Sequence, residues 1–405
     1  MNIFIIPSWY PTKESPVAGI FFKEQASYLA EYSSCNTVGV SLWGQSNDLL
    51  LWRVKDLLLP KKIMNKFSYG LNQKKKIINV AFNLFEFYCP VITWSERLLK
   101  GNFNGVLEAN NYNFEKFVEK VGKVDLIHAH VSYPAGFIAM CLAQKYNIPY
   151  IITEHMGPFP FPGLLNKDNS LLDKVFKPLN KAHKIIAVSP SLAEKIKSFN
   201  LPEPIFIPNV INEDFFNVSE KQQQNSRFTF FCLCAIEPTK GIPELLYATK
   251  RLILNGRSSF IVKIGGDGRF LPDFKQLATK LNINDYITWL GQLDRNEARQ
   301  HYQDCDAFVL PSHFETFGVV YAEAIACGKP IIGTYAGGPE CIINEVNGLL
   351  VKVRDINDLT SKMDYMIENI KHYKSQDIRS DFERRFSKKV VIPELLNLYN
   401  KVINI

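Results

Sequence analysis

Short apolar runs alternate with longer amphipathic stretches along most of the chain. The apolar runs are the length of buried strands, and the stretches that follow them repeat their apolar positions at helical spacing. In the first half, strands are predicted at 3–6, 37–42, 124–128, 150–153, 185–188 and 205–207, and helices at 20–31 and 134–145. Strands that alternate with helices are typical of α/β proteins with parallel sheets.

The same alternation restarts after a polar segment at residues 212–227, which we interpret as a linker. The later strands are predicted at 228–235, 260–265, 287–290, 307–310, 330–333 and 349–351, with helices at 241–255 and 271–280. A chain of 405 residues is too long for one compact core. We therefore expect two Rossmann-like, doubly wound domains, at 1–211 and 212–387, with a C-terminal helix at 388–405 that packs back on the first.

Residues 48–118 interrupt this alternation. Ten Lys and Arg face only four Asp and Glu between residues 48 and 104, so most of the formal charge of +7 belongs to this segment. Aromatic and apolar residues accompany the lysines. One interpretation is an amphipathic helical insertion that lies on an anionic membrane surface. The other is a helical cap that buries its aromatic residues against the domain, and the sequence leaves both open.

The composition is that of a globular protein, with 46% hydrophobic and 21% charged residues. Its eight cysteines form no CxxC pair, and Cys232 and Cys234 share one face of a predicted strand. This pattern is typical of free cysteines that pack in the core of a protein in a reducing compartment. The first residues lack the features of a signal peptide, and no apolar run reaches 18 residues. We expect a cytoplasmic location.

The candidate site centres on residues 311–328, where an apolar strand leads through a turn into a helix that begins near Gly318. A helix N-terminus presents unpaired N–H groups and favours a bound phosphate. Glu315 precedes the helix and Glu323 lies about 8 Å along its axis from the opening turn. This spacing suits one carboxylate on a sugar and one on a ribose, but it equally suits a capping carboxylate and an exposed helical residue.

Other candidates also follow predicted strands, where ligands of doubly wound sheets bind. Lys240 and Gly241 open a helix, and together with Thr316, Phe317 and Gly318 they predict a clamp for a diphosphate. His130 and His155 each end a strand of the first domain. The Asp304-Cys305-Asp306 triplet precedes an apolar strand, so we interpret it as a solvated turn and expect no metal.

These residues resemble those of family 4, GT-B-fold retaining glycosyltransferases, over nearly the whole chain except residues 48–118. The motifs occur in order along the chain. They are Pro7-Ser8-Trp9-Tyr10-Pro11 to Gly19, His128-Ala129-His130, Thr153-Glu154-His155, Ile207-Pro208-Asn209-Val210, Lys240-Gly241, Gly265-Gly266-Asp267-Gly268, Glu315 to Glu323 with Gly328-Lys329-Pro330, Gly337-Gly338-Pro339-Glu340, and Asn347-Gly348-Leu349-Leu350.

The resemblance implies roles for individual residues. Glu315 would hold donor-sugar hydroxyls and Glu323 the ribose hydroxyls. Lys240 would neutralise the leaving phosphate, and His130 would lie near the reacting carbon. The remaining donor-binding residues would be Gly19, Gly266, Leu290, Thr316, Phe317 and Gly318.

The implied reaction is metal-independent hexosyl transfer with retention, from a UDP-sugar or GDP-sugar to a hydroxyl of a glycan or lipid-linked acceptor. Together with the basic segment, whose residues 48–104 could contact an anionic membrane at its inner face, the resemblance suggests a place in cell-surface polysaccharide biosynthesis. We expect no cofactor and no nucleic-acid partner. The chain departs from the family pattern at one position. The family usually has an Arg five residues before the lysine that corresponds to Lys240, and this chain has Ala235 there. Two alternatives remain, a nucleotide-sugar 2-epimerase and a non-catalytic membrane-associated scaffold.

Overall fold

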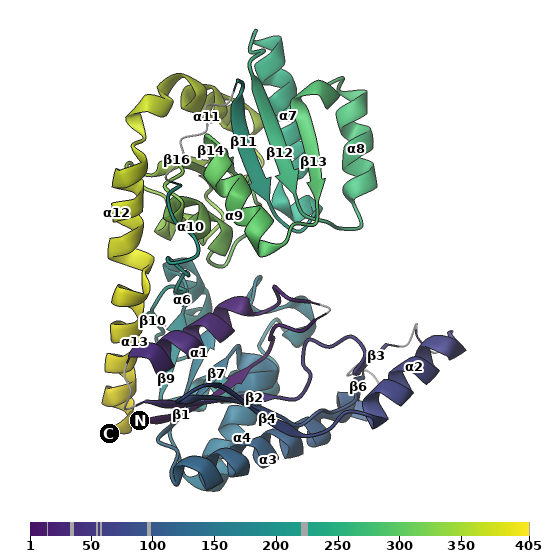
Figure 1. The fold of residues 1–405 in the computed structure, drawn as a ribbon, viewed down its shortest axis with the longest axis vertical. Coiled ribbons are helices and arrows are strands. Elements are labelled where there is room, and N and C mark those ends of the chain that lie inside the picture. The colour runs from purple at the N-terminus through teal and green to yellow at the C-terminus, as the bar shows by residue number, and fades with distance from the viewer. Residues whose placement is uncertain are drawn as a thin grey trace.

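A computed structural model shows two lobes stacked one above the other, each built around a sheet (Figure 1). The structure describes residues 1–13, 15–32, 36–53, 56, 59–94, 99–219 and 226–404. Part of the polar segment expected as the linker, residues 220–225, lies outside the described residues.

The first lobe holds an eight-stranded sheet in the order β10-β9-β8-β7-β1-β2-β5-β4. All neighbouring pairs are parallel except β4 and β5. The strands are β1 (Asn2–Pro7), β2 (Thr37–Leu42), β4 (Lys76–Ala81), β5 (Leu84–Tyr88), β7 (Leu126–His130), β8 (Tyr150–Glu154), β9 (Lys184–Ala187) and β10 (Ile205–Phe206). The helical elements are α1 (Ile20–Tyr32), α3 (Phe103–Val121), η3 (Ser132–Gly136), α4 (Phe137–Tyr146), η4 (Pro162–Leu164), α5 (Asp173–Lys181) and α6 (Pro190–Lys197).

The second lobe holds a six-stranded parallel sheet in the order β13-β12-β11-β14-β15-β16. Its strands are β11 (Phe228–Leu233), β12 (Phe260–Gly265), β13 (Ile287–Gly291), β14 (Ala307–Val309), β15 (Ile331–Thr334) and β16 (Gly348–Val351). Its helical elements are η5 (Pro238–Lys240), α7 (Ile242–Leu254), α8 (Leu271–Lys280), η6 (Asn284–Tyr286), α9 (Arg295–Asp304), α10 (Val319–Ala326), η7 (Pro339–Cys341), α11 (Ile356–Asn369) and η8 (Ile370–His372). The order of the strands reverses between β11 and β14, which is where doubly wound sheets bind their ligands.

Residues 48–118 are helical only in part, whereas the sequence suggested a helical insertion or cap. β5 and β4 extend the sheet of the first lobe, and α3 packs against β2 and β5. The local pattern explains the difference, because Phe85 and Phe87 alternate with Glu86 at strand period and are buried against the sheet. Only α2 (Pro60–Leu71) and the short strands β3 (Leu51–Trp52) and β6 (Thr93–Trp94), followed by η2 (Leu99–Asn102), lie outside the main sheet.

The last two helices, α12 (Ser375–Phe386) and α13 (Lys388–Ile403), run along one side of both lobes (Figure 1). α12 packs on α10 of the second lobe, and α13 packs on α1 of the first. One hydrophobic cluster joins α13 to the first sheet and α1, with Ile3, Val40 and Leu395 among its buried members. The helix is fixed there by a buried contact of 2.7 Å between Tyr399 Oη and His128 Nδ1.

Candidate active site

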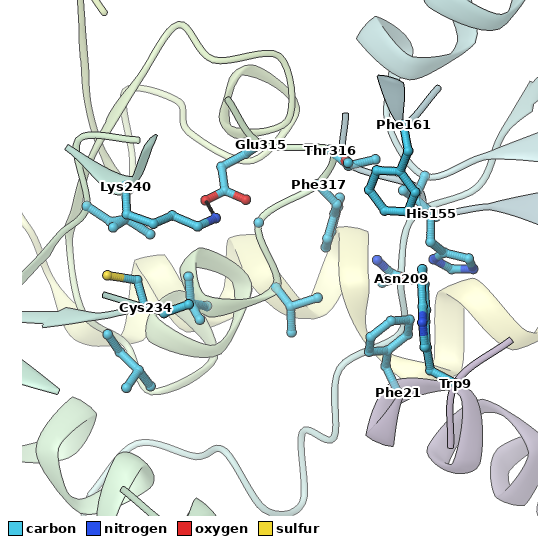
Figure 2. A pocket seen from close by; sticks show the side chains of 18 residues that line it. Trp9, Phe21, His155, Phe161, Asn209, Cys234, Lys240, Glu315, Thr316 and Phe317 are labelled. Carbon is cyan, nitrogen blue, oxygen red and sulfur yellow. Dashed lines mark hydrogen bonds and ion pairs between the residues drawn. The ribbon is translucent and has the colours of Figure 1, made fainter. Parts of the chain in front are cut away.

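A cavity of about 440 Å³ lies between the two lobes (Figure 2). Side chains of the first lobe gather on one side of it, opposite Lys240 and Cys234 of the second lobe. The lining residues are Trp9, Phe21, His155, Gly157, Phe161, Val188 and Asn209 from the first lobe, and Leu233, Cys234, Ala235, Lys240, Leu310, Glu315, Thr316, Phe317, Gly318, Val319 and Val320 from the second.

The second-lobe wall is built by the two loops at the switch point of the sheet. One loop follows β11 and carries Lys240, and the other follows β14 and carries Glu315. The loops touch at Gly241, whose φ of +71° suits glycine and where a Cβ would lie 1.9 Å from the Pro311 carbonyl oxygen. Glycine at this position therefore lets the two loops approach closely enough for their side chains to meet.

Lys240 and Glu315 form an ion pair at this junction, with 2.7 Å between Nζ and Oε1. They point toward one another across the cavity wall (Figure 2). The Ser312 hydroxyl donates to the same carboxylate oxygen at 2.8 Å. The backbone of Glu315 is also held, because its N–H donates to the Ala336 carbonyl at 3.0 Å and its carbonyl accepts from Gly338 at 2.8 Å. The carboxylate is thus fixed in place while Oε2 can still accept a hydroxyl.

The N-terminus of α10 faces the cavity beside this pair. Thr316, Phe317 and Gly318 line the cavity and lead into the first turn, so the unpaired N–H groups of that turn are near Lys240. Thr316 also reaches the other lobe, where its hydroxyl donates to the Met156 carbonyl at 3.2 Å. A fixed cation beside a helix N-terminus is an arrangement that binds phosphate groups.

Glu323 lies further along α10 and is not among the residues that line this cavity. Burial raises the pKa of its carboxyl to about 7, although the Arg295 guanidinium works against this shift. The Tyr302 hydroxyl donates to Glu323 Oε2 at 3.0 Å. Arg295 also joins the two lobes, since it pairs with Glu24 of α1 at 2.6 Å.

His130, which the resemblance implies near the reacting carbon, is not among the residues that line the cavity. The strand ends at His130 rather than at 128, and the imidazole is fully buried behind Phe22, whose ring is stacked at 4.5 Å. The histidine at the cavity surface is His155, whose Nε2 lies 3.2 Å from His130 Nδ1. Burial lowers the pKa of His155 to about 3 and holds that of His130 well below its usual range, so both are neutral near pH 7.

Three other residues singled out in the sequence, Gly19, Gly266 and Leu290, do not line the cavity. Gly19 precedes α1 with a φ of +64° and packs on the Trp9 backbone. Gly266 follows β12 and donates its N–H to the Gly291 carbonyl at 2.7 Å. Leu290 lies on β13, next to this contact. Ala235, in contrast, does line the cavity, at the position where the resemblance implies an Arg.

The aromatic part of the lining was largely missed by sequence reasoning. Phe21 and Phe161 belong to none of the motifs, although Phe21 is only two residues after Gly19. Trp9 and Asn209 do lie within quoted motifs, but nothing in those motifs shows that they share one cavity. Their proximity depends on how the lobes pack.

No group of three or more His, Cys, Asp or Glu side chains within the described ranges is arranged to hold a metal ion. Nor does any helix in the described part of the chain combine the length and hydrophobicity needed to cross a membrane.

Comparison with known proteins places this site in a family. The model of the glycosyl transferases group 1 matches residues 214–380, and that of glycosyltransferase family 4 matches residues 95–215. Among curated proteins, the chain is 29% identical to an uncharacterised glycosyltransferase, MJ1178, of Methanocaldococcus jannaschii, over 82% of this chain and 93% of that protein. It is 26% identical to the D-inositol 3-phosphate glycosyltransferase of Mycobacteroides abscessus, over 60% of this chain and 58% of that protein.

Solved structures share the fold along the full length. Sucrose-phosphate synthase from Thermosynechococcus elongatus superposes with a TM-score of 0.75 at 18% identity, covering 100% of this chain and 99% of that one. Anabaena HepE in complex with UDP superposes with a TM-score of 0.69 at 17% identity, covering 99% and 100%. Two facing Rossmann-like lobes define the GT-B class of glycosyltransferases, which confirms the expected fold. Within that class the chain belongs to family 4, the glycosyl transferases group 1.

Proposed function

We propose that this glycosyltransferase moves a hexosyl group from a UDP-sugar or GDP-sugar to an acceptor hydroxyl, with retention of configuration and without a metal ion. The observation that carries the proposal is the Lys240–Glu315 pair at the switch point, beside the N-terminus of α10. A cation and free N–H groups suit a diphosphate, and a fixed carboxylate suits sugar hydroxyls. The complex of HepE with UDP, a protein of the same fold, supports a nucleotide donor.

In this proposal the diphosphate lies against the backbone N–H groups of Phe317 and Gly318, with Lys240 at the leaving phosphate. Glu315 accepts hydrogen bonds from the donor sugar through Oε2. Glu323 takes the ribose hydroxyls, while Gly266 and Leu290 flank the nucleoside and Gly19 closes over the donor from the first lobe. His155 contacts the sugar at the cavity surface, and His130 holds the ring of His155 from behind.

The chemical step needs no side-chain nucleophile. The acceptor hydroxyl approaches the anomeric carbon on the face from which the diphosphate departs. The bond from carbon to phosphate oxygen breaks, the glycosidic bond forms, and the hydroxyl proton passes to the departing phosphate oxygen. Lys240 and the helix N-terminus stabilise the negative charge that develops on that oxygen. Because Ala235 supplies no guanidinium, these groups carry more of the charge than they would beside an Arg.

The proposal also includes the acceptor, which is a glycan or a lipid-linked molecule at the cytoplasmic face of the membrane. The reaction would then belong to the assembly of a surface polysaccharide. The support is the aromatic lining of the first lobe, since Trp9, Phe21 and Phe161 can stack on sugar rings.

The proposal is tested by screening UDP-sugars and GDP-sugars for thermal stabilisation of the protein, and then assaying transfer from the best donor to glycan and lipid-linked acceptors. We expect stabilisation by one donor class, transfer that persists in EDTA, and a product with the anomeric configuration of the donor. The control is donor incubated with the protein but without acceptor. If the sugar of the donor is epimerised in that control, the activity is 2-epimerisation and not transfer. Stabilisation by no nucleotide at all would contradict the proposal.

A further inference from the structure

Exposed apolar side chains are concentrated in one short part of the first lobe. Of the nineteen large hydrophobic residues that are exposed in the described chain, eight lie between residues 59 and 82. They are Leu59, Met64, Phe67, Leu71, Ile77, Ile78, Val80 and Phe82. The first four belong to α2 and its N-cap, and the others to β4 and the turn after it.

On α2 these side chains form a stripe. Met64, Phe67 and Leu71 follow one another at helical spacing, and they are 70%, 50% and 67% exposed. α2 projects from the first lobe on the side away from α13, as Figure 1 shows. In the described chain the Trp52 ring lies beside Phe67, with centroids 6.4 Å apart, and each member of the stripe is still at least 50% exposed.

The opposite side of α2 is held by a buried ion pair to the segment that precedes the helix. Lys66 is only 4% exposed, and its ammonium lies 2.7 Å from Asp56 Oδ2. Lys62 pairs with the other oxygen of Asp56 at 2.9 Å. The helix thus buries a lysine and exposes its apolar stripe, the reverse of a helix that uses an apolar face to pack on its own domain. As far as the described residues go, the stripe is therefore available to a partner.

The charge around the stripe restricts what that partner can be. Residues 59–82 contain six lysines and no Asp or Glu. Two of these lysines pair with Asp56. The other four are exposed, and they are Lys61, Lys74, Lys75 and Lys76. An exposed apolar stripe on a helix bordered by lysines is complementary to a bilayer that carries anionic headgroups.

We infer that α2, β4 and the turn at Phe82, together the α2–β4 surface, bind an anionic phospholipid membrane. The side chains of Met64, Phe67 and Leu71 enter the boundary between headgroups and acyl chains, and the exposed lysines contact anionic headgroups. Such binding would hold the first lobe at the membrane. The link to a lipid-linked acceptor rests on the proposed function, whereas the binding itself does not.

The test is co-sedimentation of the full-length protein with vesicles of phosphatidylcholine alone, or of phosphatidylcholine mixed with phosphatidylglycerol, in the absence of donor. We expect binding to the mixed vesicles that weakens as salt is raised. Met64→Ser, Phe67→Ser and Leu71→Ser combined should reduce it about tenfold or more. Lys61→Ser, Lys74→Ser and Lys76→Ser combined should reduce binding to the mixed vesicles only.

The matched control is Tyr247→Ser with Leu254→Ser, which removes two exposed apolar side chains from α7 of the second lobe and should leave vesicle binding unchanged. Thermal unfolding of each variant checks that it folds. The inference would be overturned if the wild-type protein does not bind the mixed vesicles. It would also be overturned if the stripe variant, with the three serine substitutions on α2, binds them as well as the wild type. If the wild type binds no vesicles but self-associates, and the stripe variant does not self-associate, the surface binds a second copy of the chain instead of a membrane. Because no donor is present, failure of the proposed reaction would leave these results unaffected.

Discussion

At the scale of single residues, the site depends on charges whose partners come from elsewhere in the chain. Lys240 and Glu315 are 75 positions apart, and each holds the other at the cavity wall. Their side chains are only 26% and 13% exposed, so loss of either one leaves the other mostly buried without its counter-charge.

Replacing Lys240 with Ala should lower turnover by about 10²–10³-fold, because the charge on the departing phosphate loses its fixed counter-charge. Glu315→Ala should cause a loss of similar size, since the donor sugar loses its carboxylate. Steady-state kinetics with the best donor measures both effects, and Lys275→Ala on the exposed face of α8 is the control. Near-wild-type turnover in either site variant would remove that residue from the mechanism.

Glu323 should make stability depend on pH. Its pKa is raised from 4.5 to about 7 in the folded protein, so the native state retains a proton that the unfolded chain releases. Its contribution to the free energy of unfolding therefore falls as the pH rises from about 4.5 to about 7. Glu323→Gln keeps an acceptor for Tyr302 and should remove this slope. Urea denaturation of both proteins across that range gives the difference, and parallel curves would show that Glu323 titrates normally.

At the scale of elements, the site is made by two strand-to-helix loops that meet where the strand order reverses. β11 and β14 are neighbours in the sheet although β12 and β13 separate them in sequence. Their loops therefore converge, and they meet beside Gly241, where the His313 N–H donates to the Thr239 carbonyl at 2.8 Å.

Gly241→Ala should destabilise the protein by about 2–4 kcal/mol and weaken nucleotide binding, because its Cβ would collide with the Pro311 carbonyl. Gly256 provides a matched control, since its φ is +90° and nothing lies within 4 Å of its Cβ position. Gly256→Ala should cost only about 1 kcal/mol, the cost of the backbone conformation alone. Chemical denaturation and calorimetry with nucleotide measure the two effects. Equal losses in the two variants would mean that the collision is relieved elsewhere.

At the scale of the whole molecule, the C-terminal helices connect the lobes. α12 belongs to the packing of the second lobe and α13 to that of the first, so the chain crosses the interface again after both sheets are complete. The Glu24–Arg295 pair and the Thr316–Met156 hydrogen bond add polar contacts across the cavity. The lobes are therefore coupled at the cavity as well as along α13.

Tyr399→Phe should lower the free energy of unfolding by about 1–2 kcal/mol, since it leaves the fully buried His128 Nδ1 without its partner on α13. Tyr365→Phe, at an exposed position of α11, is the control and should change stability by less than about 0.5 kcal/mol. Denaturation by urea compares them. A Tyr399 variant as stable as wild type would show that the hydrophobic contacts of α13 suffice to hold it.

Much of the fold could be predicted from the chain because its elements have clear periodicity. The bounds of β2, β12 and α8 agree with the expected ranges 37–42, 260–265 and 271–280. The interpretation of residues 48–118 as helical agrees with α2 and α3 but not with the strands β4 and β5, because charge and aromatic content say little about backbone geometry. The alternation of Phe85, Glu86 and Phe87 was the better signal, and it marks a strand.

The sequence by itself determined two α/β lobes, the loops that follow their strands, and the polar residues in those loops. These follow from local periodicity and turn chemistry, which act within a few residues. Only the tertiary structure decided that Lys240 pairs with Glu315, that His155 and not His130 lines the cavity, and that aromatic residues of the first lobe face the loops of the second that carry Lys240 and Glu315. Such contacts depend on strand order and on lobe packing, which are set by burial of surfaces distant in sequence.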